Sequence, residues 1–364
     1  MIKVGDNEID CLLRLLVCSL KNEKFVLPDN VNIQKLLALA VKQQVYTTVL
    51  PCLESSNSLT EEESQKWKNF KFSEIQKNLV VSKEREAVCK DFDEAGIKYM
   101  FLKGLVIRDY YPQTLMRQMS DNDILYDVSK RTELIDIMKK NGFYLMCSQD
   151  VSDDFSKPPF TLIEMHKVLF YDIKNFDINL DLWKRAVKHD DGTMRYDISP
   201  EDNYIYALAH MYKHYVYYNG CGIRFVADMY LLHYSEDNLD FDYIIPQLKK
   251  FKLYDFYKSV MSLAEAIFND ADYNDVELKL LDEIFSGGVY GNTSSLDEAI
   301  EANGGKLKFL FAKIFPSKKI MFNTYDYLKE KPYLLFPTYI KHFFIRYKYK
   351  GDSAKKLLKK VIKK

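Results

Sequence analysis

The sequence predicts an α+β protein in which a small mixed β-sheet is flanked by helical regions on both sides. Apolar residues recur at helical spacing through residues 1–95 and 191–364, whereas residues 96–190 contain short apolar segments bounded by Gly or Pro, as buried strands do. The composition, 47% hydrophobic and 29% charged, is that of an ordinary globular protein. We therefore expect an N-terminal helical region over 1–95, an α/β core over 96–190 and a C-terminal helical domain over 191–364.

The N-terminal region carries two helix signals. Four apolar residues recur at the spacing of one helix face: Ile33, Leu36, Leu37 and Ala40. Further along, Thr60 and Glu63 have the spacing of a capping box, in which each side chain accepts a bond from the other residue's backbone N–H. This box predicts the start of a long helix, and Gly96 is suited to its exit.

The core is expected to contain four strands and one helix. The strands, each short and apolar, are predicted over 98–102, 122–126, 143–146 and 162–168. The helix is predicted over 129–140, where apolar residues share one face before Gly142. We expect these elements to form a mixed sheet with helices on one side.

The C-terminal region opens with a helix start signal, because Ser199 is a capping residue that is followed by a Pro and two acids. We predict one helix from there through His214, a turn at 220–222 and a second helix over 223–234. The Lys-rich segment 355–364 places four apolar residues on one helix face. We interpret it as a solvated face, since a membrane-surface role would need a second anchor.

The whole chain excludes several classes of partner. Its 52 Lys and Arg balance 52 Asp and Glu, so the sequence carries no strong nucleic-acid signal. No segment approaches the roughly 20 apolar residues that a membrane span needs, and the N-terminus does not resemble a signal peptide. The six cysteines form no C-x-x-C pair, so we predict reduced thiols and a cytoplasmic protein.

Acidic residues mark the candidate active site. Asp121 and Asp123 stand two apart at the start of a predicted strand, so their side chains share one face about 6–7 Å apart. Two carboxylates in this arrangement can hold Mg²⁺ against a substrate phosphate. Glu164, inside another predicted strand, is the candidate third ligand, because a buried acid needs a metal, a partner or water. His166 lies on the same strand face as Glu164.

The order of these residues resembles the DNA polymerase beta nucleotidyltransferase superfamily. A strand leads into a Lys-Gly pair, a helix and an Arg-x-x-x-Asp-x-Asp motif follow, and an acid lies on a later strand. More narrowly, the chain resembles nucleotidyltransferase family 5, which has a Leu-Lys-Gly motif and an acid followed two positions later by His. The matching residues here are Leu102, Lys103, Gly104, Arg117, Asp121, Asp123, Leu125, Glu164 and His166.

The helical part is also similar to that family, over a resemblance that covers roughly residues 30 to 235. The family's Trp-x-Arg-Ala, His-x-x-x-His and Arg-x-x-x-Asp elements are matched by Trp183, Arg185, Ala186, His210, His214, Arg224 and Asp228. Two departures stand out. Lys103-Gly104 replaces the Gly-Ser or Gly-Gly of the wider superfamily, and Asn122 replaces the hydrophobic residue common between the two acids.

The resemblance implies a metal-dependent enzyme with a polymerase beta-like fold that moves an NMP group from an NTP to an unknown hydroxyl acceptor, a small molecule or a protein. It implies Mg²⁺ or Mn²⁺ held by Asp121, Asp123 and Glu164. The residues implied to bind substrate are Lys103, Gly104, Arg117, His166, His210, His214, Arg224 and Asp228. Lys103 and Arg117 would offset the triphosphate charge, and the four residues of the helical region would face the active-site cleft.

Other interpretations of the same residues stay open. Glu164 can be a structural acid paired with Arg or Lys, and Arg117 can form an ion pair that positions the Asp loop. Lys103 can be a surface lysine. The rival third acids are Asp177 and Asp181. The two histidines have a spacing that zinc sites also use, and Arg224 with Asp228 can form a simple helix pair. The alternative functions are a catalytically silent nucleotidyltransferase-fold binding protein and a phosphotransferase on the same fold.

Overall fold

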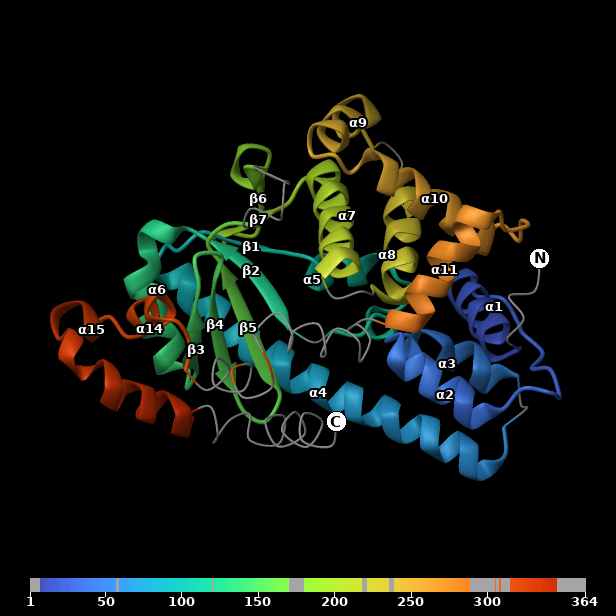
Figure 1. Cartoon of the computed structure of the whole chain (residues 1–364), viewed down its shortest axis with the longest axis horizontal. Coiled ribbons are helices and arrows are strands. Elements are labelled where there is room, and N and C mark those ends of the chain that lie inside the picture. Colours follow the sequence, from blue (N-terminus) through green and yellow to red (C-terminus); the bar gives the residue numbers. More distant parts are fainter. Residues whose placement is uncertain are drawn as a thin grey trace.

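The structure, a computed structural model, combines helices with one seven-stranded sheet in the described part of the chain, so the predicted α+β fold is confirmed (Figure 1). It describes residues 7–56, 59–119, 121–169, 180–217, 221–235, 239–288, 305, 308 and 315–345. The Lys-rich segment 355–364 and the rival acid Asp177 lie outside these residues.

The N-terminal region is helical, as predicted. Its helices are α1 (Asn7–Lys21), α2 (Ile33–Lys42), α3 (Tyr46–Ser55) and α4 (Glu61–Glu94). The capping box at the start of α4 is present, because Thr60 Oγ1 accepts from the Glu63 N–H at 3.3 Å and the Glu63 carboxylate accepts from the Thr60 N–H at 3.0 Å. Gly96 follows the helix with a φ of +67°, the left-handed conformation that favours glycine.

The sheet has the strand order β3-β4-β5-β2-β1-β7-β6. The strands are β1 (Tyr99–Phe101), β2 (Asn122–Tyr126), β3 (Tyr144–Ser148), β4 (Ser152–Lys157), β5 (Thr161–His166), β6 (Val187–Lys188) and β7 (Arg195–Asp197). The β2–β5 and β1–β7 pairs are parallel and the other pairs are antiparallel, so the sheet is mixed. Between the strands lie α5 (Gly104–Ile107), η1 (Arg108–Tyr110), η2 (Thr114–Met116), η3 (Val128–Lys130), α6 (Arg131–Lys140) and η4 (Leu182–Lys184).

The four predicted strands correspond to β1, β2, β3 and β5, and the sheet has three more. The sequence of β4 is mostly polar, with Phe155 as its single large apolar residue, so it lacks the apolar alternation that identifies a strand. The predicted core boundary at residue 190 falls between β6 and β7. The sheet therefore extends further along the chain than the sequence indicated.

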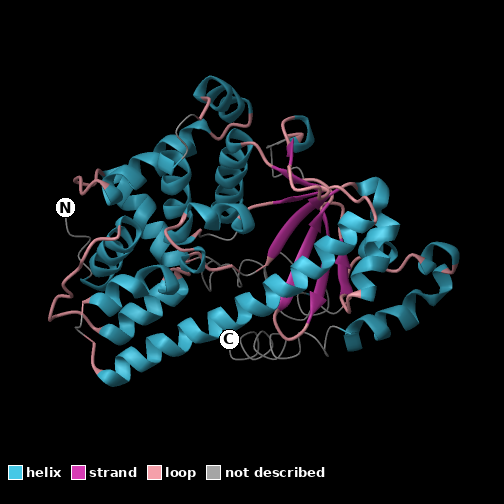
Figure 2. Ribbon diagram, turned by 180° about the vertical axis from the view of Figure 1, so that it is seen from behind, coloured by secondary structure: helices cyan, strands magenta, loops and turns pink. Residues whose placement is uncertain are grey.

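Helices meet both faces of the sheet. One face packs its apolar residues against α4 and α6, whose Phe92 and Leu134 are fully buried there (Figure 2). On the other face, Met100 and Leu125 form a smaller core with Tyr206, which belongs to α7 (Pro200–Tyr217). The prediction of helices on one side only was wrong, because the start of α7 approaches the opposite face. Acids on that second face therefore lie beside a helix of the C-terminal region.

The N- and C-terminal helical regions share one hydrophobic core. The C-terminal helices are α7, α8 (Gly222–Ser235), α9 (Phe241–Lys250), α10 (Tyr254–Phe268), α11 (Asp275–Gly287), α14 (Lys318–Thr324) and α15 (Tyr327–Glu330), followed by η5 (Pro332–Leu334) and helical residues 335–345. The predicted cap of α7 is present, since Ser199 Oγ accepts from the Asp202 N–H at 3.2 Å. In Figure 1, α1–α3 and α7–α11 gather at one end of the molecule, and α14 and α15 lie beyond the sheet at the other.

All six cysteines are free, as predicted. Among the helices of the described residues, none combines the length and the apolar character needed to cross a membrane.

Candidate functional site

The pairing of β2 with β5 brings two predicted acids together. These strands are parallel, and Asp123 is the register partner of Glu164. Cross-strand partners project from the same face of a sheet, so both carboxylates lie on the α7 side. His166, two residues beyond Glu164, shares that face. The ligand atoms of Asp123, Glu164 and His166 all lie within 4.8 Å of one another, close enough to bind one metal ion.

Two side chains, those of Lys103 and His166, hold the Asp123 carboxylate in place. Lys103 Nζ lies 2.5 Å from Asp123 Oδ1, and His166 Nε2 lies 2.8 Å from the same oxygen. Burial alone would raise the pKa of Asp123, but Lys103 and then His166 hold it well below its usual value. Asp123 is therefore ionised and oriented before any ligand binds.

The backbone of Lys103 is strained. Its φ of 49° and ψ of −120° lie in a region that residues with a Cβ rarely occupy. Such conformations cost about 1–3 kcal/mol and gather at functional sites, where surrounding contacts enforce them. Here the strained turn directs the lysine inward, with only 12% of its side chain exposed. The surface-lysine interpretation of Lys103 does not fit this geometry.

Glu164 lacks the compensation that Asp123 has. The basic group within 4 Å of it is His166, at 3.8 Å, and no Lys or Arg of the described residues forms an ion pair with it. Burial, and then the negative charge of Asp123, raises the pKa of Glu164 to about 8. The structure therefore offers no support for Glu164 as a structural acid paired with Arg or Lys. An uncompensated carboxylate beside a second one is suited to a bound cation.

Asp121 lies just before β2 and outside the three-residue group. Burial and then Asp123 raise its pKa, while Lys103 and Arg224 lower it. Asp121 is thus close enough to the group to interact with it electrostatically. The predicted ligand set was Asp121, Asp123 and Glu164; the structure brings the second and third of these together with His166. The rival acid Asp181 is an exposed residue 3.8 Å from Lys184.

Helix α7 presents three polar residues to the carboxylates at one-turn spacing: Tyr206, His210 and Lys213. Burial raises the pKa of Tyr206, and the nearby charge of Lys103 opposes that rise. Burial and then Lys103 hold the pKa of His210 well below its usual value, so its imidazole is neutral at pH 7. His210 Nε2 lies 3.2 Å from His214 Nε2. Within the described part of the chain no third His, Cys, Asp or Glu completes a metal group with these two histidines, so zinc finds no support there.

Lys213 is a residue that the sequence interpretation missed. Burial and then Lys103 lower its pKa, whereas Glu164 and Asp123 raise it, so its ammonium lies within electrostatic reach of both acids. None of the described acids is within 4 Å of that ammonium. The sequence could have indicated Lys213 as a site residue, because it follows His210 by three positions and so lies on the same helix face.

The predicted Arg117 and Asp228 bind each other. Arg117 donates from Nε and Nη2 to the two carboxylate oxygens of Asp228, each at 2.8 Å, and Tyr111 OH donates to Asp228 Oδ1 at 2.7 Å. Both charged side chains are buried, 6% and 3% exposed. Gly104 leaves the space that the Arg117 guanidinium occupies, because a Cβ there would overlap Arg117 Nη1. Arg117 thus forms the positioning ion pair that was its alternative interpretation.

Side chains from three helices donate hydrogen bonds to the loop that leads into Asp121. Arg224 of α8 donates to the Gln118 carbonyl at 2.8 Å. Lys77 of α4 donates to the Met119 carbonyl at 2.5 Å, and Thr48 of α3 donates to the Met116 carbonyl at 2.6 Å. Arg224 therefore does not form the simple helix pair with Asp228. The helical body fixes the position of the acids from outside the sheet.

The unusual Asn122 between the two acids has a structural explanation. Alternation along β2 points it away from Asp123, toward the face that α4 covers. Arg85 of α4 is buried there and donates to Asn122 Oδ1 at 2.9 Å. A hydrophobic residue at 122 would remove the acceptor of Arg85 Nη1 and leave the guanidinium only its 3.4 Å bond to Ser82 Oγ. The departure from the family pattern therefore concerns attachment to α4 rather than substrate.

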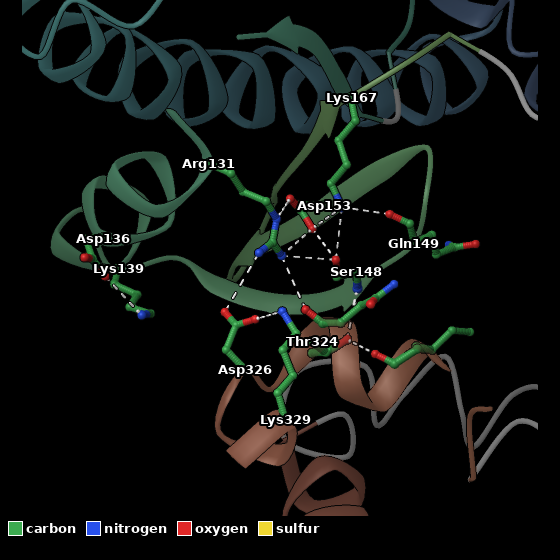
Figure 3. Close-up of polar contacts among 12 residues, drawn as sticks. Arg131, Asp136, Lys139, Ser148, Gln149, Asp153, Lys167, Thr324, Asp326 and Lys329 are labelled. Atoms are coloured by element: carbon green, nitrogen blue, oxygen red, sulfur yellow. Dashed lines mark hydrogen bonds and ion pairs between the residues drawn. The ribbon is translucent and has the colours of Figure 1, made fainter. Parts of the chain in front are cut away.

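The sheet also carries a buried acid that belongs to a different group. Asp153 of β4 is fully buried. It accepts hydrogen bonds from Arg131 Nε at 2.9 Å, from Lys167 Nζ at 2.9 Å and from the Ser148 hydroxyl (Figure 3). Tyr126 OH also donates to it, at 3.1 Å. Burial would raise the pKa of Asp153, but these donors hold it below its usual value. Its neighbour Asp154, the register partner of Glu164, lies on the side of the candidate site.

A mixed sheet with paired acids on adjacent parallel strands, next to a Lys-Gly turn, is the arrangement that the resemblance to nucleotidyltransferases led us to expect. Over residues 29–269 the chain matches the family described as uncharacterised nucleotidyltransferase, and it belongs to that family. The match continues past the resemblance seen in the sequence and ends just after α10. No curated protein and no solved structure matches the chain.

Proposed function

We propose that the protein is a metal-dependent nucleotidyltransferase that moves an NMP group from an NTP to a hydroxyl acceptor. The observation that carries this proposal is the group formed by Asp123, Glu164 and His166, whose ligand atoms lie within 4.8 Å of one another on adjacent strands. Membership of the nucleotidyltransferase family supports the same reaction.

The residues fit a divalent cation. Carboxylate oxygens from Asp123 and Glu164 are the donors that Mg²⁺ and Mn²⁺ prefer. The raised pKa of Glu164 reflects negative charge that a bound cation would neutralise. Asp123, Glu164 and the nearby Asp121 would hold the metal, which supplies Lewis-acid activation of phosphate and hydroxyl oxygens. His166 and Lys103 keep the Asp123 carboxylate in place.

The cations around the acids suit a triphosphate. Lys213 is the cation best placed to bind it, because it reaches toward the acids without an ion-pair partner among the described residues. The positive charge of Arg224 lowers the pKa of Asp121, and its guanidinium donates to the Gln118 carbonyl. Arg224 therefore contributes positive potential at the edge of the site. Neutral His210, half-buried near Lys103, can hydrogen-bond an acceptor or base without adding charge.

Binding is tested by thermal unfolding with each of the four NTPs, with and without Mg²⁺ or Mn²⁺. At a nucleotide concentration 100 times Kd, the wild type should gain about 2.7 kcal/mol of apparent stability. Asp123→Asn and Glu164→Gln should lose the metal-dependent part of this gain. The matched control is Asp136→Asn, which changes an exposed acid of α6. A gain that survives in both site variants contradicts the proposal.

The reaction is tested by the fate of the label from α-labelled and γ-labelled NTP, incubated with the protein itself and with a metabolite extract. Nucleotidyl transfer places the α label on an acceptor and releases the γ label as pyrophosphate. A phosphotransferase places the γ label on the acceptor instead. A silent binding protein shows the metal-dependent thermal shift and neither product, and either of these two results overturns the proposed reaction.

A further inference from the structure

An exposed apolar stripe runs along the helical residues 335–345 and the turn before them. Its members lie at helical spacing and are Tyr333, Phe336, Ile340, Phe343 and Phe344. Tyr333 is 75% exposed, Phe336 70% and Phe344 63%. Large apolar side chains gathered on one exposed helix face mark an interaction surface, whereas single exposed ones need no explanation.

The opposite face of this helix is polar and buried. Thr338 and His342 are 2% and 1% exposed. The Thr338 hydroxyl lies 2.9 Å from Tyr327 OH, and His342 Nδ1 lies 3.1 Å from Tyr325 OH. The helix is thus inverted relative to an ordinary surface helix, because polar contacts hold it to the protein while its apolar side faces solvent.

This part of the chain is joined firmly to the sheet. Helix α14 packs against β3, where Ser148 N donates to Thr324 Oγ1 at 3.0 Å. Arg131 donates to the Asn323 carbonyl at 3.3 Å and lies 3.8 Å from Asp326 (Figure 3). A surface bound by the stripe would therefore be held at a fixed position relative to the sheet.

Positive charge is concentrated in the same part of the sequence. Residues 331–364 contain eleven Lys and Arg and one acid, Asp352, so they carry a net charge of +10. Because the whole chain has a net charge of zero, the other 330 residues carry −10. Lys331 and Lys341 also line a hollow of about 310 Å³ beside the stripe, together with Tyr327, Leu334, Pro337 and Thr338.

We propose that the stripe of residues 333–344 docks the protein onto an anionic lipid bilayer surface. The aromatic and aliphatic side chains would enter the interfacial layer, and cations of the same stretch of sequence, Lys331 and Lys341 among them, would bind the lipid phosphates. The negative remainder of the chain would be repelled, which orients the protein with this end toward the membrane. This is peripheral binding, and it needs no membrane-spanning helix.

Charge and apolar exposure together favour a membrane over the other occupants. A second copy of the chain would bring +10 against +10, so charge opposes pairing of two such segments. A nucleic acid would match the cations but would leave aliphatic Ile340 without a suitable contact. The Lys-rich segment alone would be a weak membrane signal, and the stripe supplies the second anchor that stable binding requires.

The test is co-sedimentation of the full chain with vesicles of phosphatidylcholine alone or mixed with phosphatidylglycerol. Wild type should bind the anionic vesicles, and the neutral ones about tenfold or more weakly. Phe336→Glu/Ile340→Glu should reduce binding to anionic vesicles about tenfold or more. The matched control, Phe72→Glu/Leu79→Glu, places the same charges on an exposed apolar pair of α4, 62% and 68% exposed, and should bind as wild type does.

A second measurement avoids substitution. Amide exchange of residues 333–344 in the wild type should slow when anionic vesicles are added, and exchange in α11 should not change. The proposal is overturned if the wild type does not bind anionic vesicles, or if the stripe variant binds them as well as the wild type. Light scattering that shows a dimer lost in the stripe variant, or preferential binding to duplex DNA, would overturn it as well.

Discussion

Two acids on opposite faces of one sheet have opposite surroundings. Asp153 accepts from Arg131, Lys167, Tyr126 and Ser148, and these donors lower its pKa. Glu164 has a histidine at 3.8 Å as its nearest basic partner, lies beside other acids and has its pKa raised to about 8. The register explains the separation of the two groups, because Asp154 pairs with Glu164 and its neighbour Asp153 must point to the other face.

The difference separates a structural acid from a ligand-binding one. Where the chain supplies every donor that a carboxylate can accept from, the group stabilises the fold and has no capacity left for a ligand. Where it leaves carboxylates crowded and undercompensated, the fold bears a cost that a bound cation removes. The count of donors distinguishes the two acids.

The largest expected effect is on activity. Asp123→Asn should lower nucleotidyl transfer about a thousandfold, because metal-dependent charge stabilisation is worth several kcal/mol and each 1.36 kcal/mol is tenfold in rate. Asp153→Asn, assayed below its own unfolding temperature, should stay within about tenfold of wild type. Pyrophosphate release measures both. Equal losses of activity in the two variants would contradict the assignment of Asp123 to ligand binding and of Asp153 to the fold.

The second effect is on stability. Asp153→Asn should lower the free energy of unfolding by about 3 kcal/mol, since it removes the nearest countercharge of the half-buried Arg131 and Lys167. Urea unfolding followed by circular dichroism measures the loss. As a control, Asp136→Asn removes an exposed partner of Lys139 and should cost less than about 0.5 kcal/mol. Similar losses in both variants would show that the Asp153 group contributes little.

The third effect is a pH dependence of that loss. The pKa of Asp153 is lowered in the folded state, so its contribution to stability is complete above the unfolded value of about 3.9 and is lost as pH falls below it. The stability difference between wild type and Asp153→Asn should therefore be constant near neutral pH and narrow below about pH 4. Urea unfolding at a series of pH values checks this, and a difference that widens in acid has the wrong sign.

The smallest effect has the opposite sign. In metal-free buffer at pH 7, Glu164→Gln should raise the free energy of unfolding by about 1 kcal/mol, because folding raises the pKa of Glu164 and a neutral amide avoids the cost of that shift. Asp123→Asn should bring no such gain, since Asp123 is the partner of Lys103 and His166. Thermal unfolding in a chelator compares the two variants. A destabilised Glu164→Gln would mean that this acid is structural after all.

Much of the fold was predictable, because local signals and tertiary packing agree over most of it. The box at Thr60, the strand Asn122–Tyr126 and the cap at Ser199 are all present where the sequence placed them. Strand β4 was not predictable, since its stability comes from pairing with two neighbours and from the donors around Asp153. These stabilising contacts come from residues distant in sequence. The sequence of β4 itself therefore shows no alternation of apolar and polar residues that would identify a strand.

The site was predictable where motif spacing encodes it and not where the fold brings distant residues together. Asp123 and Glu164 follow from their strand positions, and the register shows them as partners. The bond between Arg117 and Asp228 joins residues 111 apart, and the helical spacing of Asp228 to Arg224 suggested a different partner. Lys213 looked like any helix-surface lysine until α7 was placed against the sheet.

Helix α4 sets the separation between the helical core and the sheet core. Its 34 residues span about 50 Å and contain neither Pro nor Gly, the usual sites of a kink. Trp67 near one end belongs to the helical core, and Phe92 near the other belongs to the sheet core. Moving one core toward the other would require breaking this continuous helix. The sheet that carries Asp123 and Glu164 is therefore held at a set distance from the helical core.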